Sequence, residues 1–375
     1  MNKQKIKLSK SIVGNAEKKA LARVIDGSYL GMGRYVDEFE KELERYLDTS
    51  AVVCVNSGTA ALHCALMGIG LKPGDEVLVQ SLTYIACFQA ISAAGAVPVA
   101  CEVVPRTCTI DLNDAEKKIT NKTRVIMPVH YSGRPGALDE VYKFAGKHGL
   151  RVVEDAAHAF GTLYKGRKIG SFGDVVCFSF DGIKNITCGE GGAVVSRDRN
   201  VIQSVMDARL LGVHKDTEKR YLGQRSWEFD VSAQGYRYHM SNLFAAIGSA
   251  QLKRFERSFK PHRQKLAKRY HHSLRSLPGI VLFPDEYDRI VPHIFPVRVG
   301  GGKRDGLRQY LIGHGVECGV HYFPNHLLSY YGKGSIRLPV TEKVYRELLS
   351  LPLHPDITVK DQDYILRKIK HFLRT

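Results

Sequence analysis

Between residues 50 and 200, short runs of β-branched residues alternate with stretches of helical character. The run AVVCVNSG precedes TAALHCALMGIG, EVLVQS precedes TYIACFQAISAAG, and RVVEDAA and VVCFSF follow later in the same region. Strands that alternate with helices along a chain build a mainly parallel sheet with helices on both faces. The alternation therefore predicts an α/β fold organised around one large sheet.

The chain has 375 residues, which is too long for one simple core, so we expect a second domain. The polar, turn-rich stretch from His214 to Gly235 predicts a long loop, and long loops in compact chains are often functional. Helical sequence then runs from Met240 to about Leu277, and shorter strands and helices follow Pro278. We therefore predict a large α/β domain over residues 1–255 and a smaller α+β domain over residues 256–375.

Composition and cysteine spacing argue against several classes of protein. The chain is 44% hydrophobic, and no apolar run approaches the roughly 20 residues that a membrane helix needs. The basic N-terminus MNKQKIKLSKSIVGNAEKK lacks the apolar core of a signal peptide. The eight cysteines form no C-x-x-C pair, so neither a zinc site nor a thioredoxin-like motif is indicated. We expect a cytoplasmic protein with free, buried thiols and no metal centre.

The formal net charge of +17 is compatible with nucleic acid, an anionic membrane surface or an anionic small ligand. The densest basic run, from Lys253 to Ser276, has the composition of a solvated helix face. No helix-turn-helix, zinc-finger or aromatic RNA-binding signature accompanies it. The charge therefore favours an anionic substrate over nucleic acid.

The stretch NSGTAALH, from Asn56 to His63, places a turn between a predicted strand and an alanine-rich helix. Backbone amides at such a helix start, together with the helix dipole, suit a phosphate group. A plain helix cap by Ser57 or Thr59 explains the same residues. Alone, this motif leaves both interpretations open.

The stretch VVEDAAHAFG ends a predicted apolar strand with Glu154 and Asp155. Ligands of open α/β sheets bind at this end of the strands, where a carboxylate can pair with a positively charged ring nitrogen. His158, three residues later, can donate or accept a hydrogen bond. A capped strand end with a satisfied core histidine is the alternative.

Lys184 follows the predicted strand CFSF and precedes the glycine turn GEGG. A lysine near a desolvated site can bond to an aldehyde and later carry protons, whereas a loop lysine is the simpler alternative. A phosphate cup, a strand-end aspartate and this lysine are the three anchors that pyridoxal 5′-phosphate (PLP) requires. Tyr84, at another strand–helix junction, adds an aromatic ring that can stack on the cofactor.

Several long stretches carry a family resemblance: YLGMGRYVDEFEKELERYL, NSGTAALHCAL, PGDEVLVQSLTYIACFQAISAAGAVPV, VEDAAHAFGTLYKGRKIGSFGD, FSFDGIKNITCGEGGAVVS, AAIGSAQL and LSLPLHP. Together they resemble the DegT-type aminotransferases, which act on nucleotide-linked keto sugars. The resemblance implies a fold-type I PLP enzyme with a seven-stranded-type sheet. It also implies a homodimer whose active sites are built from both subunits.

The resemblance carries roles to individual positions. Lys184 matches the Schiff-base lysine, Asp155 the partner of the pyridine nitrogen, and His158 the position that contacts the ring hydroxyl oxygen. The remaining matches are cofactor contacts, with Gly58, Thr59 and Ser179 at the phosphate and Tyr84 as the stacking aromatic.

The chain departs from the family pattern in GYRYHMSN, where the family commonly has G-Y-N-Y-R. Arg237 replaces an asparagine that reaches the partner subunit's cofactor phosphate, and His239 replaces the arginine. Arg237 can still bind phosphate, with a full charge instead of an amide. Asn242 lies nearby and is left without a role.

The family implies transfer of an amino group from L-glutamate to the keto carbon of a nucleotide-linked keto-deoxy sugar, for a surface glycan such as lipopolysaccharide O-antigen. Relatives that deoxygenate sugars carry histidine at the position of Lys184, so transamination is favoured over dehydration. The stretch IKNITCGEGG is similar to members that aminate carbon 4, and a carbon-3 enzyme is the alternative. Expected substrate contacts are Arg220 and Arg225 near Trp227 in the polar loop, and His321 and Tyr322 in GVHYFPNH.

Two further alternatives stay open. A transaminase of a free cyclitol or aminoglycoside precursor would act fully without a nucleotide. A PLP-containing DNA-binding regulator, suggested by the charge of +17, would bind duplex in a salt-sensitive manner and tolerate Lys184→Ala.

Overall fold

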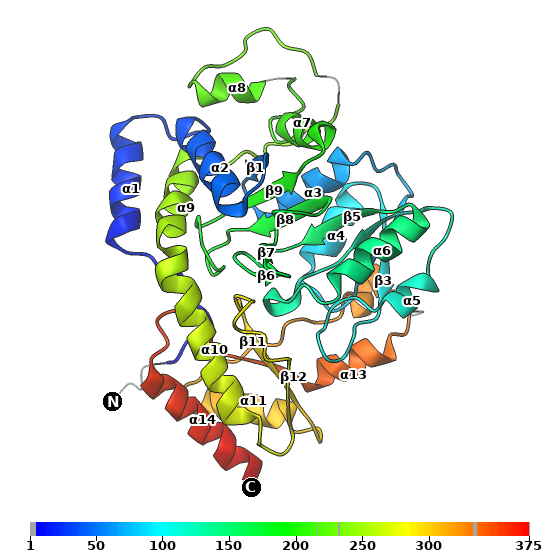
Figure 1. Ribbon diagram of the computed structural model, residues 1–375, viewed down its shortest axis with the longest axis vertical. Helices are drawn as coiled ribbons and strands as arrows, with labels where there is room; N and C mark the ends of the chain where they lie inside the picture. Colours follow the sequence, from blue (N-terminus) through cyan, green and yellow to red (C-terminus); the bar gives the residue numbers. More distant parts are fainter. Residues whose placement is uncertain (1–4, 215, 232, 333–335, 375) are drawn as a thin grey trace.

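The computed structural model describes residues 5–214, 216–231, 233–332 and 336–374 (Figure 1). Its main feature is a seven-stranded sheet in the order β1-β9-β8-β5-β4-β2-β3. Strand β9 is antiparallel to β1 and β8, and the other neighbouring pairs are parallel. The predicted mainly parallel α/β sheet is thus confirmed. The strands are β1 (Val52–Val55), β2 (Glu76–Gln80), β3 (Val97–Cys101), β4 (Thr123–Met127), β5 (Arg151–Asp155), β8 (Val175–Ser179) and β9 (Gly192–Ser196).

Helices cover both faces of this sheet, because successive residues of its buried strands point to opposite sides. In β5, Val152 belongs to one buried apolar cluster and Val153 to the other. The first cluster includes residues of α2 (Arg34–Leu47) and α6 (Leu138–His148). The second includes residues of α3 (Gly58–Gly68), α4 (Ala86–Ala93) and α7 (Arg199–Ala208).

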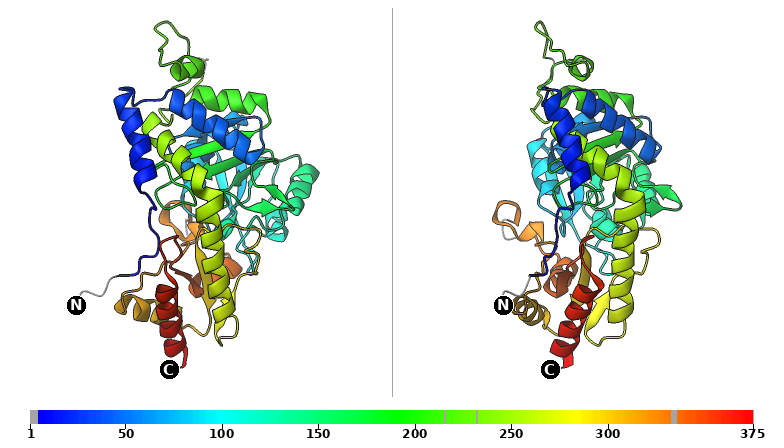
Figure 2. Two further views of the ribbon diagram at one scale, coloured as in Figure 1. Left: turned by 60° about the vertical axis from the view of Figure 1, so that its left-hand side comes forward. Right: turned by 90° about the vertical axis from the view of Figure 1, so that its left-hand side faces the viewer.

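A smaller antiparallel sheet lies at the other end of the molecule, with strands in the order β10-β11-β12. Helix α9 continues through one π-helical turn into α10 and links the two sheets as one long helix (Figure 2). The predicted domain boundary at residue 255 falls inside this helix, and near the N-terminus Ile6 pairs with Val316. The division into two domains stays a prediction. The elements of this part are α9 (Asn242–Arg254), the π-helical turn (Phe255–Phe259), α10 (Lys260–Leu274), β10 (Ile280–Leu282), β11 (Phe295–Val299), α11 (Arg304–Gly313), α13 (Pro339–Glu347), β12 (Leu348–Leu351) and α14 (Val359–Arg374).

The remaining elements are short or peripheral. They are α1 (Asn15–Asp26), α5 (Leu112–Glu116), β6 (Leu163–Tyr164), β7 (Arg167–Lys168), α12 (Ser329–Gly332) and 3₁₀ turns at Tyr131–Gly133 and Asn325–Leu327.

The long loop predicted from His214 to Gly235 is wrong in one part, because it contains a short helix, α8 (Asp216–Tyr221). Asp216 explains the helix: its carboxylate accepts from Arg220 Nε at 2.7 Å and from Ser226 Oγ at 2.8 Å. The helical ion pair is local and polar, so no apolar periodicity marks it in the sequence. Lys215 and Ser232 of this stretch lie outside the described residues.

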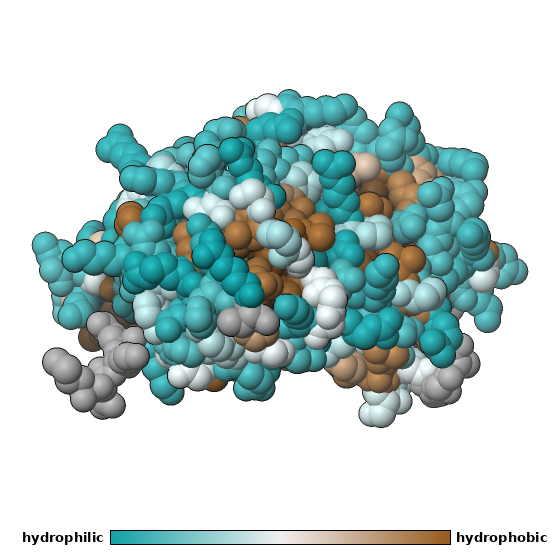
Figure 3. Space-filling view, turned by 90° about the horizontal axis from the view of Figure 1, so that it is seen from below, coloured by the Kyte–Doolittle hydropathy of each residue, from teal (hydrophilic) through white to brown (hydrophobic). Residues whose placement is uncertain are grey.

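Seen from the end that carries α14, the surface is mostly hydrophilic, with apolar patches between the polar side chains (Figure 3). Among the residues that the structure describes, no helix combines the length and apolar character needed to cross a membrane.

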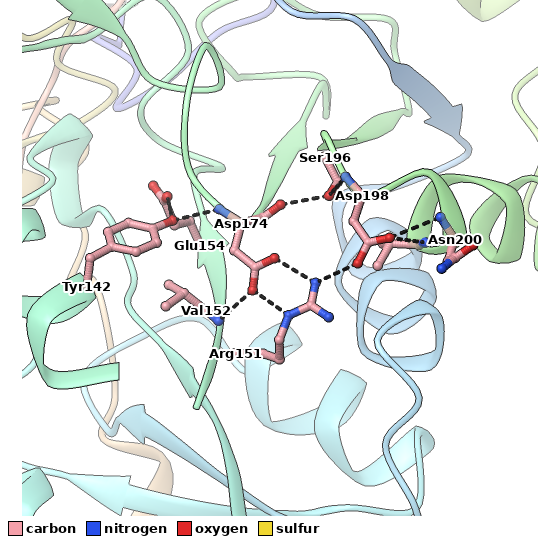
Figure 4. A network of polar contacts seen from close by, with 9 residues as sticks. Tyr142, Arg151, Val152, Glu154, Asp174, Ser196, Asp198 and Asn200 are labelled. Carbon is pink, nitrogen blue, oxygen red and sulfur yellow. Dashed lines mark hydrogen bonds and ion pairs between the residues drawn. The ribbon is translucent and has the colours of Figure 1, made fainter. Parts of the chain in front are cut away.

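A polar network fixes the amino ends of β5 and β8 against the carboxyl end of the antiparallel strand β9 (Figure 4). Asp174 accepts two hydrogen bonds from the Arg151 guanidinium, at 2.7 and 2.6 Å, and a third from the Val152 backbone at 3.0 Å. Arg151 also contacts Asp198 at 3.2 Å, and Asp198 caps α7. Bidentate arginine–carboxylate pairs are geometrically specific. The network therefore sets the register of the strands that end at the candidate site.

We expect Asp174→Ala to lower the free energy of unfolding by about 1–3 kcal/mol, because it removes several charge-assisted hydrogen bonds at a half-buried position. The matched control is Lys143→Ala, which breaks an exposed ion pair with Glu140 of 2.8 Å and should leave the free energy of unfolding nearly unchanged. Urea unfolding of both variants measures the difference. Equal losses would contradict a special role for the Asp174 network.

Candidate active site

A cavity of about 390 Å³ opens where β5 and β8 end and α3 begins. Ligands of open α/β sheets bind at this edge. The cavity brings together most of the side chains predicted from the sequence, although they come from distant parts of the chain. The predicted residues that line it are Gly58, Thr59, Tyr84, Asp155, His158, Ser179, Lys184, His321 and Tyr322.

The start of α3 forms one end of the cavity. Ser57 caps the helix, its Oγ accepting from the Ala60 backbone N–H at 3.1 Å, which confirms the capping interpretation for Ser57. A Cβ on Gly58 would lie 2.7 Å from Cβ of Ser179, and a Cβ on Gly192 would lie 2.4 Å from the Ser57 carbonyl oxygen. Only glycine permits this close approach, which leaves the first amides of α3 beside the Ser179 hydroxyl. Such a helix start suits a phosphate.

The last two residues of β5 point to opposite sides of the sheet. Glu154 accepts from Tyr142 at 2.6 Å and contacts His130 Nε2 at 2.7 Å, away from the cavity. Asp155 faces the cavity with only 5% of its surface exposed. Its Oδ1 accepts from the Ala157 backbone N–H at 3.0 Å, and its Oδ2 accepts from Cys87 Sγ at 2.9 Å. Each oxygen keeps a lone pair for a cationic ligand.

Lys184 lies in the loop between β8 and β9, half-buried on the cavity wall. Its backbone N–H donates to the Asp181 carbonyl at 3.1 Å, which forms the turn that carries the side chain. Burial lowers the pKa of the Lys184 amine from its usual 10.5, and the nearby carboxylates of Asp155 and Asp181 partly oppose this effect. The lysine therefore supplies more neutral amine than an exposed one.

His158 is held as a neutral ring. Its Nδ1 accepts from the Ser132 backbone N–H at 3.3 Å, so the ring proton is on Nε2, 3.0 Å from the Tyr322 hydroxyl. Burial lowers the pKa of His158 well below 6.5, and Lys184 and His321 lower it further. A neutral His158 thus presents an N–H donor inside the cavity.

His293 also lines the cavity, and the sequence prediction missed it. Its ring lies 4.4 Å from that of His158, centroid to centroid, and it is almost fully buried. Burial and then Lys184 lower its pKa well below the usual value. The buried guanidinium of Arg263 donates to the His293 carbonyl at 3.3 Å. The only signal in the sequence is one polar residue in the apolar run VPHIFPV.

Tyr84, His321 and Tyr322 form the outer part of the cavity. The Tyr84 ring is 57% exposed and lies 5.6 Å from the Tyr322 ring. His321 Nδ1 lies 2.8 Å from Ser350 Oγ, and burial followed by the charge of Lys184 lowers its pKa to about 4. Neutral imidazoles thus surround the lysine.

Arg220, Arg225 and Arg237 do not line this cavity within the described part of the chain. They line a separate cavity of about 140 Å³, together with Asp216 and His239. Asn242, which received no predicted role, donates from Nδ2 to the Tyr29 carbonyl at 2.9 Å.

The donor set of the 390 Å³ cavity fits PLP. A helix start with a serine hydroxyl suits the phosphate, a buried carboxylate suits a protonated ring nitrogen, and a lysine of lowered pKa suits the aldehyde. All three groups face the same cavity. A helix cap and a loop lysine with no common role would not be expected to meet there.

Residues 11–370 match the sequence model of the DegT/DnrJ/EryC1/StrS aminotransferase family. The chain is 33% identical to the spore coat polysaccharide biosynthesis protein SpsC of Bacillus subtilis, over 97% of this chain and 96% of that protein. The aminotransferase TlmJ from Streptoalloteichus hindustanus superposes with a TM-score of 0.91 at 30% identity, covering 98% and 99% of the two chains.

Spr1654 from Streptococcus pneumoniae, described as a sugar aminotransferase and solved in its PMP form, superposes with a TM-score of 0.92. The two chains are 28% identical, with 99% and 98% covered. The chain belongs to the DegT/DnrJ/EryC1/StrS aminotransferase family and is a PLP-dependent sugar aminotransferase of fold type I.

Proposed function

We propose that this enzyme moves an amino group from L-glutamate to carbon 4 of a nucleotide-linked keto-deoxy sugar, for synthesis of a surface polysaccharide. The observation that carries the transamination is Lys184, whose amine shares one cavity with the buried Asp155 carboxylate. The relative named for spore coat polysaccharide synthesis supports a surface glycan as the destination. A lipopolysaccharide O-antigen is one such glycan.

The cavity residues have distinct proposed roles in holding PLP. The first amides of α3, with Gly58, Thr59 and Ser179, bind the phosphate. Asp155 would pair with the ring nitrogen and keep it protonated. The cofactor supplies an aldehyde and an electron-accepting ring when bound. Tyr84 would stack on the ring, and His158 would offer its Nε2–H, which here lies 3.0 Å from the Tyr322 hydroxyl, to the ring hydroxyl oxygen.

Lys184 is the proposed catalytic acid and base. Its amine would hold the aldehyde of the cofactor, and the same amine, when free and neutral, would accept and return the proton of the substrate carbon. A base must be unprotonated to accept that proton, and burial lowers the pKa of Lys184 in the required direction. The rings of His158, His293 and His321 are neutral, so they do not repel the positively charged amino group of the amino donor.

We expect borohydride to fix PLP covalently on Lys184. The labelling rate should increase with pH, and the midpoint of this increase should lie below pH 10.5. Only the neutral amine reacts, so the rate rises as the pH rises through the lowered pKa. Asp181 raises the pKa of Lys184, so Asp181→Asn moves the midpoint to lower pH. Mass spectrometry of the reduced protein at a series of pH values measures this.

Lys184→Ala is the control for this labelling. It should take up no label at any pH. A labelled Lys184→Ala protein would show that another amine holds the cofactor.

We propose a homodimer in which each active site receives residues from both subunits. The segment that carries α8 projects from the molecule (Figures 1 and 2) and exposes large apolar side chains, with Leu222 at 74%, Trp227 at 88% and Phe229 at 60%. Exposed apolar side chains grouped on one projection are typical of an interface. The same segment brings Arg225 beside Arg237, and a second subunit would receive these cations.

Mixing two inactive variants tests the shared site. We expect Lys184→Ala and Arg237→Ala each to lose most activity alone, and a 1:1 mixture with exchanged subunits to recover about a quarter of wild-type activity. Half of the random dimers are mixed, and each holds one site with both native residues. Activity no greater than the sum of the two variants would contradict a site shared through Arg237.

The substrate contacts follow from charge and position. Arg220 and Arg225 suit the phosphates of a nucleotide, and His321 and Tyr322 lie at the outer part of the cavity, where a sugar must enter. The polar sugar and the anionic nucleotide thus meet separate groups of residues. A carbon-3 enzyme of the same family differs only in how the sugar is oriented there.

A panel of UDP-, dTDP- and GDP-linked 3-keto and 4-keto sugars, offered with L-glutamate, tests the substrate. We expect amination of a 4-keto sugar, loss of more than about tenfold in kcat/KM for Arg225→Ala, and no product from the free sugar. Mass spectrometry of the products measures this. Amination of only 3-keto sugars would contradict the proposed carbon, and full activity on free sugars or cyclitols would contradict the nucleotide.

A further inference from the structure

Cys87, in the first turn of α4, is buried directly against the carboxylate of the candidate site. Its Sγ lies 2.9 Å from Asp155 Oδ2, so one oxygen of that carboxylate meets the thiol and the other meets the Ala157 amide. The sequence predicted free, buried thiols at all eight cysteines, and the structure confirms this. Cys87 differs from a plain core thiol because its partner faces the cavity.

The direction of this hydrogen bond follows from the chemistry of its two groups. An ionised carboxylate only accepts, so the S–H must donate. Burial first, and then the charge of Asp155, raise the pKa of the Cys87 thiol well above 9.0, which keeps the proton on sulfur.

The Cys87 sulfur also accepts a hydrogen bond, from Thr83. Thr83 Oγ1 lies 3.4 Å from the same sulfur and donates to it, and the Thr83 carbonyl accepts from Asn325 Nδ2 at 2.8 Å. Asn325 is itself buried. The thiol is therefore held in place from both sides.

We propose that Cys87 is a positioning residue for PLP: its thiol, together with the Ala157 amide, fixes the orientation in which the Asp155 carboxylate meets the ring nitrogen. This inference rests on the proposed role of Asp155. Without the thiol, Oδ2 loses its only hydrogen-bond donor among the described residues. The hydrogen bond from the Ala157 amide to Oδ1 then remains, and it alone does not stop the carboxylate from rotating. A carboxylate that must be reoriented binds a cation less tightly.

Simple packing is the competing explanation, and Cys64 provides the matched control. Its thiol is equally buried in the same apolar cluster, on α3, and no hydrogen bond joins it to Asp155 within the described residues. Cys64→Ala removes the same sulfur volume without touching the carboxylate. Cys87→Ser restores a donor where Cys87→Ala has none.

The experiment measures dissociation constants by dialysis from the holoenzyme, for PLP and for an analogue in which a ring C–H replaces the nitrogen. We expect Cys87→Ala to weaken PLP binding about tenfold, as one charge-assisted hydrogen bond allows, and analogue binding by less than about twofold. Cys87→Ser should bind PLP within about threefold of wild type, and Cys64→Ala within about twofold.

Equal weakening of PLP and analogue by Cys87→Ala, or none for either, would overturn the positioning role. Asp155→Asn separates this failure from failure of the proposed function. If Asp155→Asn keeps the wild-type preference for PLP over the analogue, the assignment of Asp155 to the ring nitrogen is wrong. If it loses that preference while Cys87→Ala keeps it, only the role of Cys87 is wrong.

Discussion

The parallel pairing of β5 with β8 is the constraint on which the site depends. Asp155 ends β5 and Ser179 ends β8, with Asp155 opposite Cys177 in the register, so both chains leave the sheet at one edge. The Asp174 network fixes the same two strands at their other ends. Because a strand slip of one residue turns every side chain to the opposite face, the network and the site share one register. Moving Asp155 by one position would replace it with Glu154 and its partners His130 and Tyr142.

Desolvation sets the electrostatics of the cavity. In the proposed reaction Lys184 must change charge, and it lies among imidazoles that burial keeps neutral. A cationic histidine beside it would repel the protonated amine and also a positively charged ring. The neutral histidines instead offer directed hydrogen-bond partners, as the tautomer of His158 illustrates. The histidines of the cavity therefore add no positive charge to that of Lys184.

The sequence predicted those residues whose signals are local. A strand-end aspartate, a serine before an alanine-rich helix and a lysine before glycines are each readable within ten residues, and the α/β alternation brings them to one edge. His293 and Cys87 were missed because a single histidine or cysteine in an apolar run also fits a core position. Helix α8 depends on contacts that Asp216 makes with Arg220 and Ser226, which no periodicity reveals. The antiparallel direction of β9 follows from a turn that the strand pattern does not specify.

The structure separates the rigid part of the site from its variable part. The proposed cofactor contacts lie at strand ends and at a helix start, where the packing of Gly58 and Gly192 leaves no room for another side chain. The arginines proposed for the nucleotide lie on an exposed segment whose order comes from a few polar contacts. Substitutions there change little of the core, so the same sheet can serve different sugars while its chemistry stays constant. Arg237, where the family commonly has asparagine, lies on this variable side, because it is exposed and shares a cavity with Arg220 and Arg225. Its long, charged side chain suits the proposed contact with a phosphate of the partner's site.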